Sequence, residues 1–117
     1  MTEREKDKIA QVKEFCFARD GYACRNCGES IHTHGSPQLA HGIANTKTNL
    51  KIFGKEIIHH PDNLFSTCCI RCNDAMNIGH KPAESRALAD SIRRKLDAEK
   101  EYRDNIQKTI PNRIDAA

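Results

Sequence analysis

Two groups of cysteines carry the clearest chemical signal in this chain. Cys24 and Cys27 form a CxxC turn, and Cys68, Cys69 and Cys72 follow about forty residues later. Two thiolate pairs can close a tetrahedral four-cysteine site around zinc, with Zn–S distances of about 2.3 Å. Four protein thiolates leave no open position on the metal, so we expect a structural Zn²⁺ that contributes folding energy.

A redox CxxC motif and unconnected buried thiols are the alternatives to a zinc site. A redox motif would need a thioredoxin-like βαβ context, which the sequence does not contain. Five cysteines compete for four positions, so the choice between Cys68 and Cys69 stays open at this point. The remaining cysteine, Cys16, falls among the apolar positions of an expected helix and is assigned to the core.

A histidine between small residues is the second feature with chemical potential. His41 stands at the centre of QLAHGIA, residues 38–44, which we expect to form a short strand. Histidine is a suitable general base at neutral pH, because its ordinary pKa lies near 6.5. Such a base can take a proton from a water molecule and so activate it for hydrolysis.

The composition describes a small domain with little core material. The 117 residues are 38% hydrophobic and 5% aromatic, without tryptophan, so a metal or a partner should contribute to stability. The net charge of +3 is too small to establish a nucleic-acid partner by itself. The sequence contains no apolar run long enough for a membrane span and begins without a signal peptide. We therefore expect a cytoplasmic protein whose cysteines bind metal.

Helices are expected at both ends of the chain, around a loop-rich middle. Periodicity predicts a helix over residues 4–18, closed by Asp20 and Gly21. Residues 45–62 are expected to form a polar connection with a second candidate strand at 56–59, and a short helix should begin within 73–79. A long terminal helix should start at Pro82 or Ala83 and end at Pro111. The apolar stripe of this helix could pack on the domain, or could pair with a second copy or a partner protein. The stripe consists of Leu88, Ile92, Leu96, Tyr102, Ile106 and Ile110.

The order of these segments resembles the zinc-bearing HNH endonucleases. RDGYACRNCG at 19–28 resembles the opening of that motif, and LAH at 39–41 resembles the strand with the catalytic histidine. Asn63-Leu64 and Cys72-Asn73 resemble the middle and the end of the motif. The stretch from QLAHGIANTK to CIRCNDAMNIG is similar to a subgroup found in phages and bacteria, which implies that the cytoplasm is that of a bacterial cell or a phage-infected host. The resemblance covers residues 19–80.

The resemblance implies an α+β chain with a ββα-metal (His-Me finger) core stapled by zinc. The nuclease domain would span residues 19–80, between an N-terminal helix (1–18) and a C-terminal helical extension (81–117). The implied function is metal-dependent hydrolysis of DNA. His41 would be the general base, Asn63 would brace the loop between the strands, and Asn73 would bind the catalytic metal. That metal is Mg²⁺, Mn²⁺ or Ni²⁺ in the family, and at times Zn²⁺.

The chain departs from the family at one metal position. Many members have Asp or His immediately before the base, where this chain has Ala40. Another residue should then supply the missing ligand, and His60 is the first candidate. The weaker candidates are His59, His32 and His34.

The resemblance also bears on the second cysteine group and on the rival functions. Counted from Asn63, Cys68 falls at the family's usual ligand position, whereas the CxxC spacing from Cys72 favours Cys69. We prefer Cys68 and keep Cys69 as the alternative. The rivals to a nuclease are an impaired HNH-derived zinc module that binds nucleic acid or protein without cutting, and a structural zinc protein that acts through helix pairing.

Overall fold

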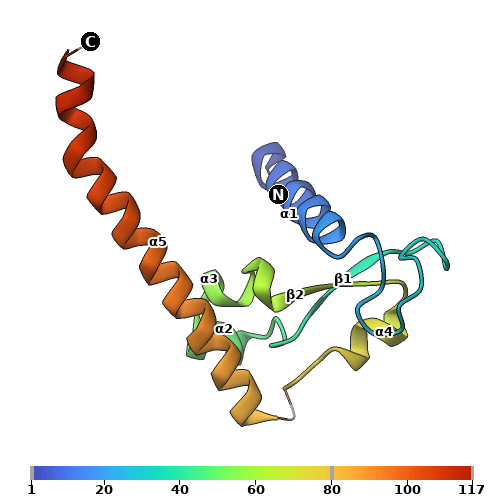
Figure 1. Cartoon of the computed structure of the whole chain (residues 1–117). Helices are drawn as coiled ribbons and strands as arrows, with labels where there is room; N and C mark the ends of the chain where they lie inside the picture. Colours follow the sequence, from blue (N-terminus) through green and yellow to red (C-terminus); the bar gives the residue numbers. More distant parts are fainter. Residues whose placement is uncertain (1, 80, 117) are drawn as a thin grey trace.

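The computed structural model describes the backbone of residues 2–79 and 81–116, and the side chains of 2–79 and 81–107. The chain is an α+β protein with a two-stranded sheet and helices around it (Figure 1). No helix in the described part of the chain is long and apolar enough to cross a membrane. The elements in order are α1 (Glu3–Arg19), β1 (Gln38–His41), α2 (Lys47–Phe53), α3 (Lys55–Ile58), η1 (Pro61–Asn63), β2 (Leu64–Thr67), α4 (Ile70–Ala75) and α5 (Pro82–Ala116).

The two strands form an antiparallel pair that places His41 at one end. In the register Gln38 lies opposite Thr67, and His41 lies opposite Leu64. The expected strand over 38–44 is therefore shorter, since β1 ends at His41. The short helix α4 lies against both strands. This arrangement has the two strands and the short helix that we expected, but it does not by itself establish the ββα-metal fold.

The helix α1 stands over the sheet and is fixed to it at its C-terminal end (Figure 1). The Thr2 side chain caps its start by accepting the Glu5 N–H at 3.1 Å. At its other end the Arg19 guanidinium donates to the Pro61 and Leu64 carbonyl oxygens, at 2.7 and 2.6 Å. Cys16, one turn earlier, is fully buried, as expected for a core thiol.

The hydrophobic core joins the start of α5 to the loop and helices between the strands. Leu88 and Leu96 pack against its buried centre, so the first part of the predicted apolar stripe is confirmed. Further along α5, Tyr102 is 67% exposed and lies outside the core. The side chain of Ile110 lies outside the described residues. The buried centre consists of Ile43, Ile57, Ile58, Ala89 and Ile92.

The sequence predictions are also wrong for three segments between β1 and α5. Residues 56–59 belong to the helix α3 and its C-cap, and not to a strand. The prediction failed because an apolar pair as short as Ile57-Ile58 has no periodicity that distinguishes a helix from a strand. The polar connection also contains α2, which Thr46 caps by accepting the Asn49 N–H. The helix expected within 73–79 starts earlier, at Ile70, and ends at Ala75.

The end of the long helix also differs from the prediction. The helix α5 begins at Pro82, as expected, and continues past Pro111 to Ala116. Proline removes one backbone hydrogen bond and can kink a helix, but the chain can remain helical on both sides of it.

Candidate metal centre and histidine groove

Four cysteines meet at one end of the sheet, where β2 leads into α4. The sulfur atoms of Cys24, Cys27, Cys68 and Cys72 all lie within 4.8 Å of one another. The Cys27–Cys68 and Cys68–Cys72 sulfur distances are 3.6 and 3.8 Å. Tetrahedral zinc with Zn–S bonds of about 2.3 Å holds its sulfurs about 3.8 Å apart. The four cysteines could therefore hold a structural metal such as zinc.

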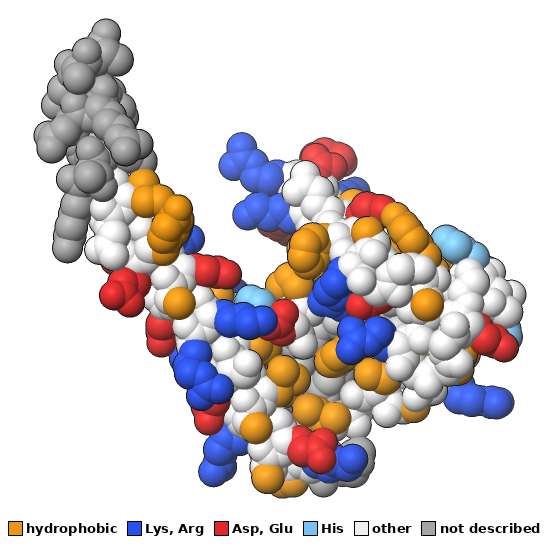
Figure 2. Space-filling view, viewed as in Figure 1, with side chains coloured by type: hydrophobic (Ala, Val, Ile, Leu, Met, Phe, Trp, Pro, Cys, Tyr) orange, Lys and Arg blue, Asp and Glu red, His pale blue; other side chains and the backbone are white. Residues whose placement is uncertain are grey.

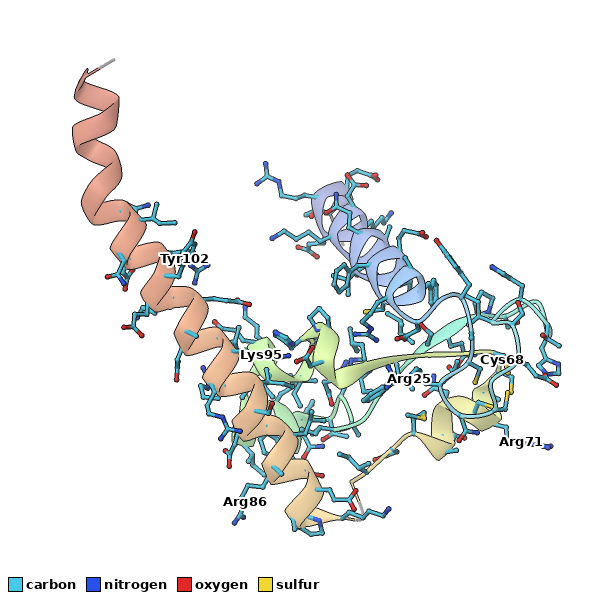
Figure 3. All side chains as sticks on the ribbon, viewed as in Figure 1. Arg25, Cys68, Arg71, Arg86, Lys95 and Tyr102 are labelled. Atoms are coloured by element: carbon cyan, nitrogen blue, oxygen red, sulfur yellow. The ribbon has the colours of Figure 1, made fainter. Side chains whose placement is uncertain are left out.

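Backbone hydrogen bonds shape the first cysteine turn and fix it to the sheet. The Gly28 N–H donates to the Cys24 carbonyl at 2.9 Å, and the Cys24 N–H donates to the Glu29 carbonyl at 2.7 Å. Gly28 has φ +84°, a left-handed conformation that favours glycine. The Arg25 N–H donates to the Ser66 carbonyl in β2 at 2.8 Å, which holds the turn beside the second cysteine pair. Figure 3 shows Arg25 and Cys68 on this side of the molecule.

The structure places Cys68, and not Cys69, among the four clustered thiols. Cys68 is 1% exposed, whereas Cys69 is partly exposed and its sulfur lies 3.9 Å from that of Cys68. Cys69 is the N-cap of α4 and makes no side-chain cap hydrogen bond. A second, smaller group joins His34 with Cys68 and Cys69. The geometry therefore supports the preference for Cys68 as the structural ligand.

The thiols of the cluster differ in how readily they ionise without a metal. Burial would raise the pKa of Cys24, but backbone N–H groups of Cys27 and Asn26 lower it to about 6. Burial raises the pKa of Cys68, and hydrogen bonds to the neighbouring thiols raise it further. A metal bound by all four sulfurs would displace the proton of Cys68. The affinity of the cluster for the metal should therefore fall as the pH falls.

The predicted base lines a groove of about 880 Å³ beside α1. The polar lining of the groove brings together His41, His59, Asn73 and Gln38, from β1, the end of α3 and α4. The same groove contains aliphatic and lysine side chains from α1. Two residues named by the resemblance, the base and the third motif position, therefore lie in one concave site.

The two histidines of the groove are neighbours. The Nε2 atom of His41 lies 3.4 Å from Nδ1 of His59, and the rings meet edge to face. Burial lowers the pKa of His41, and the nearby charge of His59 lowers it further. The imidazole of His41 is therefore neutral at pH 7, which is the form that accepts a proton.

His59, and not His60, is the histidine beside the predicted base. The Nδ1 atom of His60 accepts the Asp62 N–H at 3.0 Å and caps η1, so this ring nitrogen is used within a local turn. The weaker candidates His32 and His34 both belong to the cysteine-turn region, and neither of them lines the groove. His32 stacks on Tyr22, and His34 lies near Glu29.

Asn63 is fully buried and ties together the segments that follow β1 and precede β2. Its Oδ1 accepts the Ile43 N–H at 2.8 Å, and its Nδ2 donates to the carbonyls of Ile43 and Ile58 at 3.1 and 2.8 Å. The Gly42 N–H donates to the Asn63 backbone carbonyl. A Cβ at Gly42 would come within 2.9 Å of the Phe65 ring and 3.2 Å of Asn63 Oδ1, so any larger residue would displace these side chains. These hydrogen bonds hold the segment after His41 against the segment before β2.

The side chain of Asn73 is oriented by a partner that sequence reasoning missed. The Asn73 amide nitrogen donates to Gln38 Oε1 at 2.8 Å, which leaves its carbonyl oxygen as the available donor atom for a metal. No spacing pattern links Gln38 to Asn73, because the two residues meet only where α4 lies against β1. Ala40, at the position where many family members have a metal ligand, is fully buried and does not line the groove.

Comparisons with family models, curated proteins and solved structures found no match to this chain.

Proposed function

We propose that this chain is a metal-dependent endonuclease that hydrolyses phosphodiester bonds of DNA, with an HNH-type site. One observation carries the proposal: His41, the neighbouring His59 and an oriented Asn73 line the same groove. The buried brace at Asn63 supports it, because its hydrogen bonds hold the segment next to the base.

His41 would take the proton from the attacking water. The 3.4 Å contact to His59 is longer than the roughly 2.9–3.0 Å of a usual N–H hydrogen bond, so it is weak, and the attacking water would take its place at His41 Nε2. The hydrogen bonds of Asn63 to Ile43 keep the residues after His41 in place while the proton moves.

We infer that His59 and Asn73 would hold the divalent cation, together with water and the substrate. His59 offers an imidazole nitrogen, which suits zinc or nickel. Asn73 offers a carbonyl oxygen, which suits magnesium or manganese. Such a cation would offset charge on the phosphate and on the leaving oxygen. With few protein ligands, it would keep several water molecules.

The test is cleavage of supercoiled plasmid DNA with Mg²⁺, Mn²⁺, Ni²⁺ or Zn²⁺ added in separate reactions. His41→Ala should lose at least the ~10²–10⁴-fold that general-base catalysis supplies, with zinc content and melting temperature unchanged. Asn73→Ala should also lose activity, but excess metal should restore part of it. His32→Ala, a histidine outside the groove, is the matched control and should cut like the parent. Full activity of His41→Ala would refute the assignment of the base.

The second candidate is a zinc module that binds nucleic acid without cutting it. It is favoured by the poor supply of acidic ligands: of the described residues that line the groove, Glu5 is the one carboxylate. DNA binding by the parent without cleavage in all four metals would support this second function.

A further inference from the structure

The helix α1 forms one wall of the groove that contains the histidine pair. Its C-terminal end is fixed through Cys16 and Arg19, and its N-terminal part extends along the opening. Figure 2 shows hydrophobic and basic side chains next to one another on α1. The α1 residues of the groove lining are Glu5, Lys8, Ile9, Val12 and Lys13.

The groove carries unpaired positive charge. Lys8 and Lys13 of α1 and Lys55 at the start of α3 all line it. Among the side chains that the structure describes, none of these three ammonium groups has an ion pair. With Glu5 counted, the groove lining carries three lysine charges and one carboxylate charge. Unpaired cations along a concave surface favour an anionic ligand.

The wall between these charges is aliphatic. Ile9, Val12, Leu39 and Leu64 line the groove, and Ile9 is 46% exposed. Inorganic phosphate, or the outside of a duplex, would offer charge but few apolar faces to such a wall. A strand with unpaired bases offers both a phosphate backbone and exposed base faces, which proteins commonly bind by a cationic groove with aromatic side chains. In this groove aliphatic side chains would cover the bases instead.

We propose that the groove binds a single strand of nucleic acid with unpaired bases. Lys8, Lys13 and Lys55 contact phosphates on either side of the phosphodiester that lies at His41, and the aliphatic wall of Ile9 covers bases or sugars. This inference rests on the proposed function and narrows its substrate: α1 selects an unpaired strand over a duplex.

The experiment measures binding alone, by fluorescence anisotropy of short labelled DNA, single-stranded and duplex, without added divalent metal. The parent should bind the single strand more tightly than the duplex. For single strands each phosphate contact contributes about −0.7 to the slope of log K against log salt. K8Q/K13Q should therefore reduce the slope by about 1.4, and should weaken binding about tenfold at ~0.15 M salt.

Two control variants test the position of the charge and of the apolar wall. K47Q/K51Q on α2 removes the same charge outside the groove and should change the single-strand affinity much less. Ile9→Gln should reduce the preference for the single strand, whereas Ile52→Gln, at a side chain 66% exposed on α2, should not. Circular dichroism of each variant should match the parent.

The outcomes separate this inference from the nuclease proposal. Equal or tighter binding of the duplex, or equal effects of K8Q/K13Q and K47Q/K51Q, would overturn the inference. Absence of binding to any nucleic acid would overturn both proposals. The expected binding profile, with no cleavage of single-stranded DNA or of plasmid DNA in any of the four metals, would uphold the groove and refute the nuclease.

Discussion

Serine in place of Cys69 should leave the metal bound, whereas serine in place of Cys68 should release it. The two residues are adjacent, so the variants differ in little except the direction of one side chain. The Cys68 sulfur lies 3.6 and 3.8 Å from those of Cys27 and Cys72, at the separation expected around zinc. Cys69 lies outside that group of four.

The expected magnitudes follow from these positions. Zinc contributes about 10–16 kcal/mol of binding free energy in small four-ligand sites, so one thiolate of four corresponds to ~3–4 kcal/mol, or ~10²–10³-fold in affinity. Cys69 is the N-cap of α4 and makes no side-chain cap hydrogen bond. Serine is among the best N-cap residues, so Cys69→Ser should be neutral or should stabilise the protein by up to ~1 kcal/mol. For a domain of this size that is a rise in Tm of about 3–6 °C.

The assay combines zinc competition against a chromophoric chelator with elemental analysis and thermal melting by circular dichroism. Cys16→Ser is the control for a buried thiol outside the cluster, and should lower stability while keeping zinc. Loss of zinc from Cys69→Ser with retention by Cys68→Ser would refute the ligand assignment. Parent-like zinc binding and melting of both variants would show that the two side chains do not contribute to a metal site.

Two further predictions concern the groove. Asn63→Ala would leave three backbone groups of Ile43 and Ile58 without their partner, and should lower the free energy of unfolding in urea by ~3–5 kcal/mol. The control Asn49→Ala loses a hydrogen bond nearer the surface and should lower it by ~1 kcal/mol. Equal losses of stability in the two variants would contradict the bracing role of Asn63. NMR titration should find the pKa of His41 below its ordinary 6.5, and any His41-dependent cleavage should fall as the pH falls through it. His59→Gln should raise that pKa, because a nearby positive charge is removed while burial remains, and an unchanged or lower value would speak against this account.

Much of the architecture could be predicted from local patterns. The CxxC turn and the later cysteine group predicted the cluster, because thiols at that spacing can converge on one ion. The starts of the first and last helices followed from periodicity and from Pro82, signals that act within a few residues of one another. Helices α2 and α3 were missed, because four to seven residues are too few for a helical period to stand out from a polar loop.

Tertiary structure decided which of two neighbouring side chains enters each site. Cys68 joins the cluster while Cys69 starts α4, and His59 meets His41 while His60 caps its own turn. Adjacent residues have almost the same local sequence context, yet their side chains leave the backbone in different directions. The direction that faces the site depends on how the whole segment is anchored, here by long-range contacts such as those of Asn63 and Arg19. Spacing along the chain can therefore nominate the chemistry, and the packing of distant segments selects the residue that is placed to perform it.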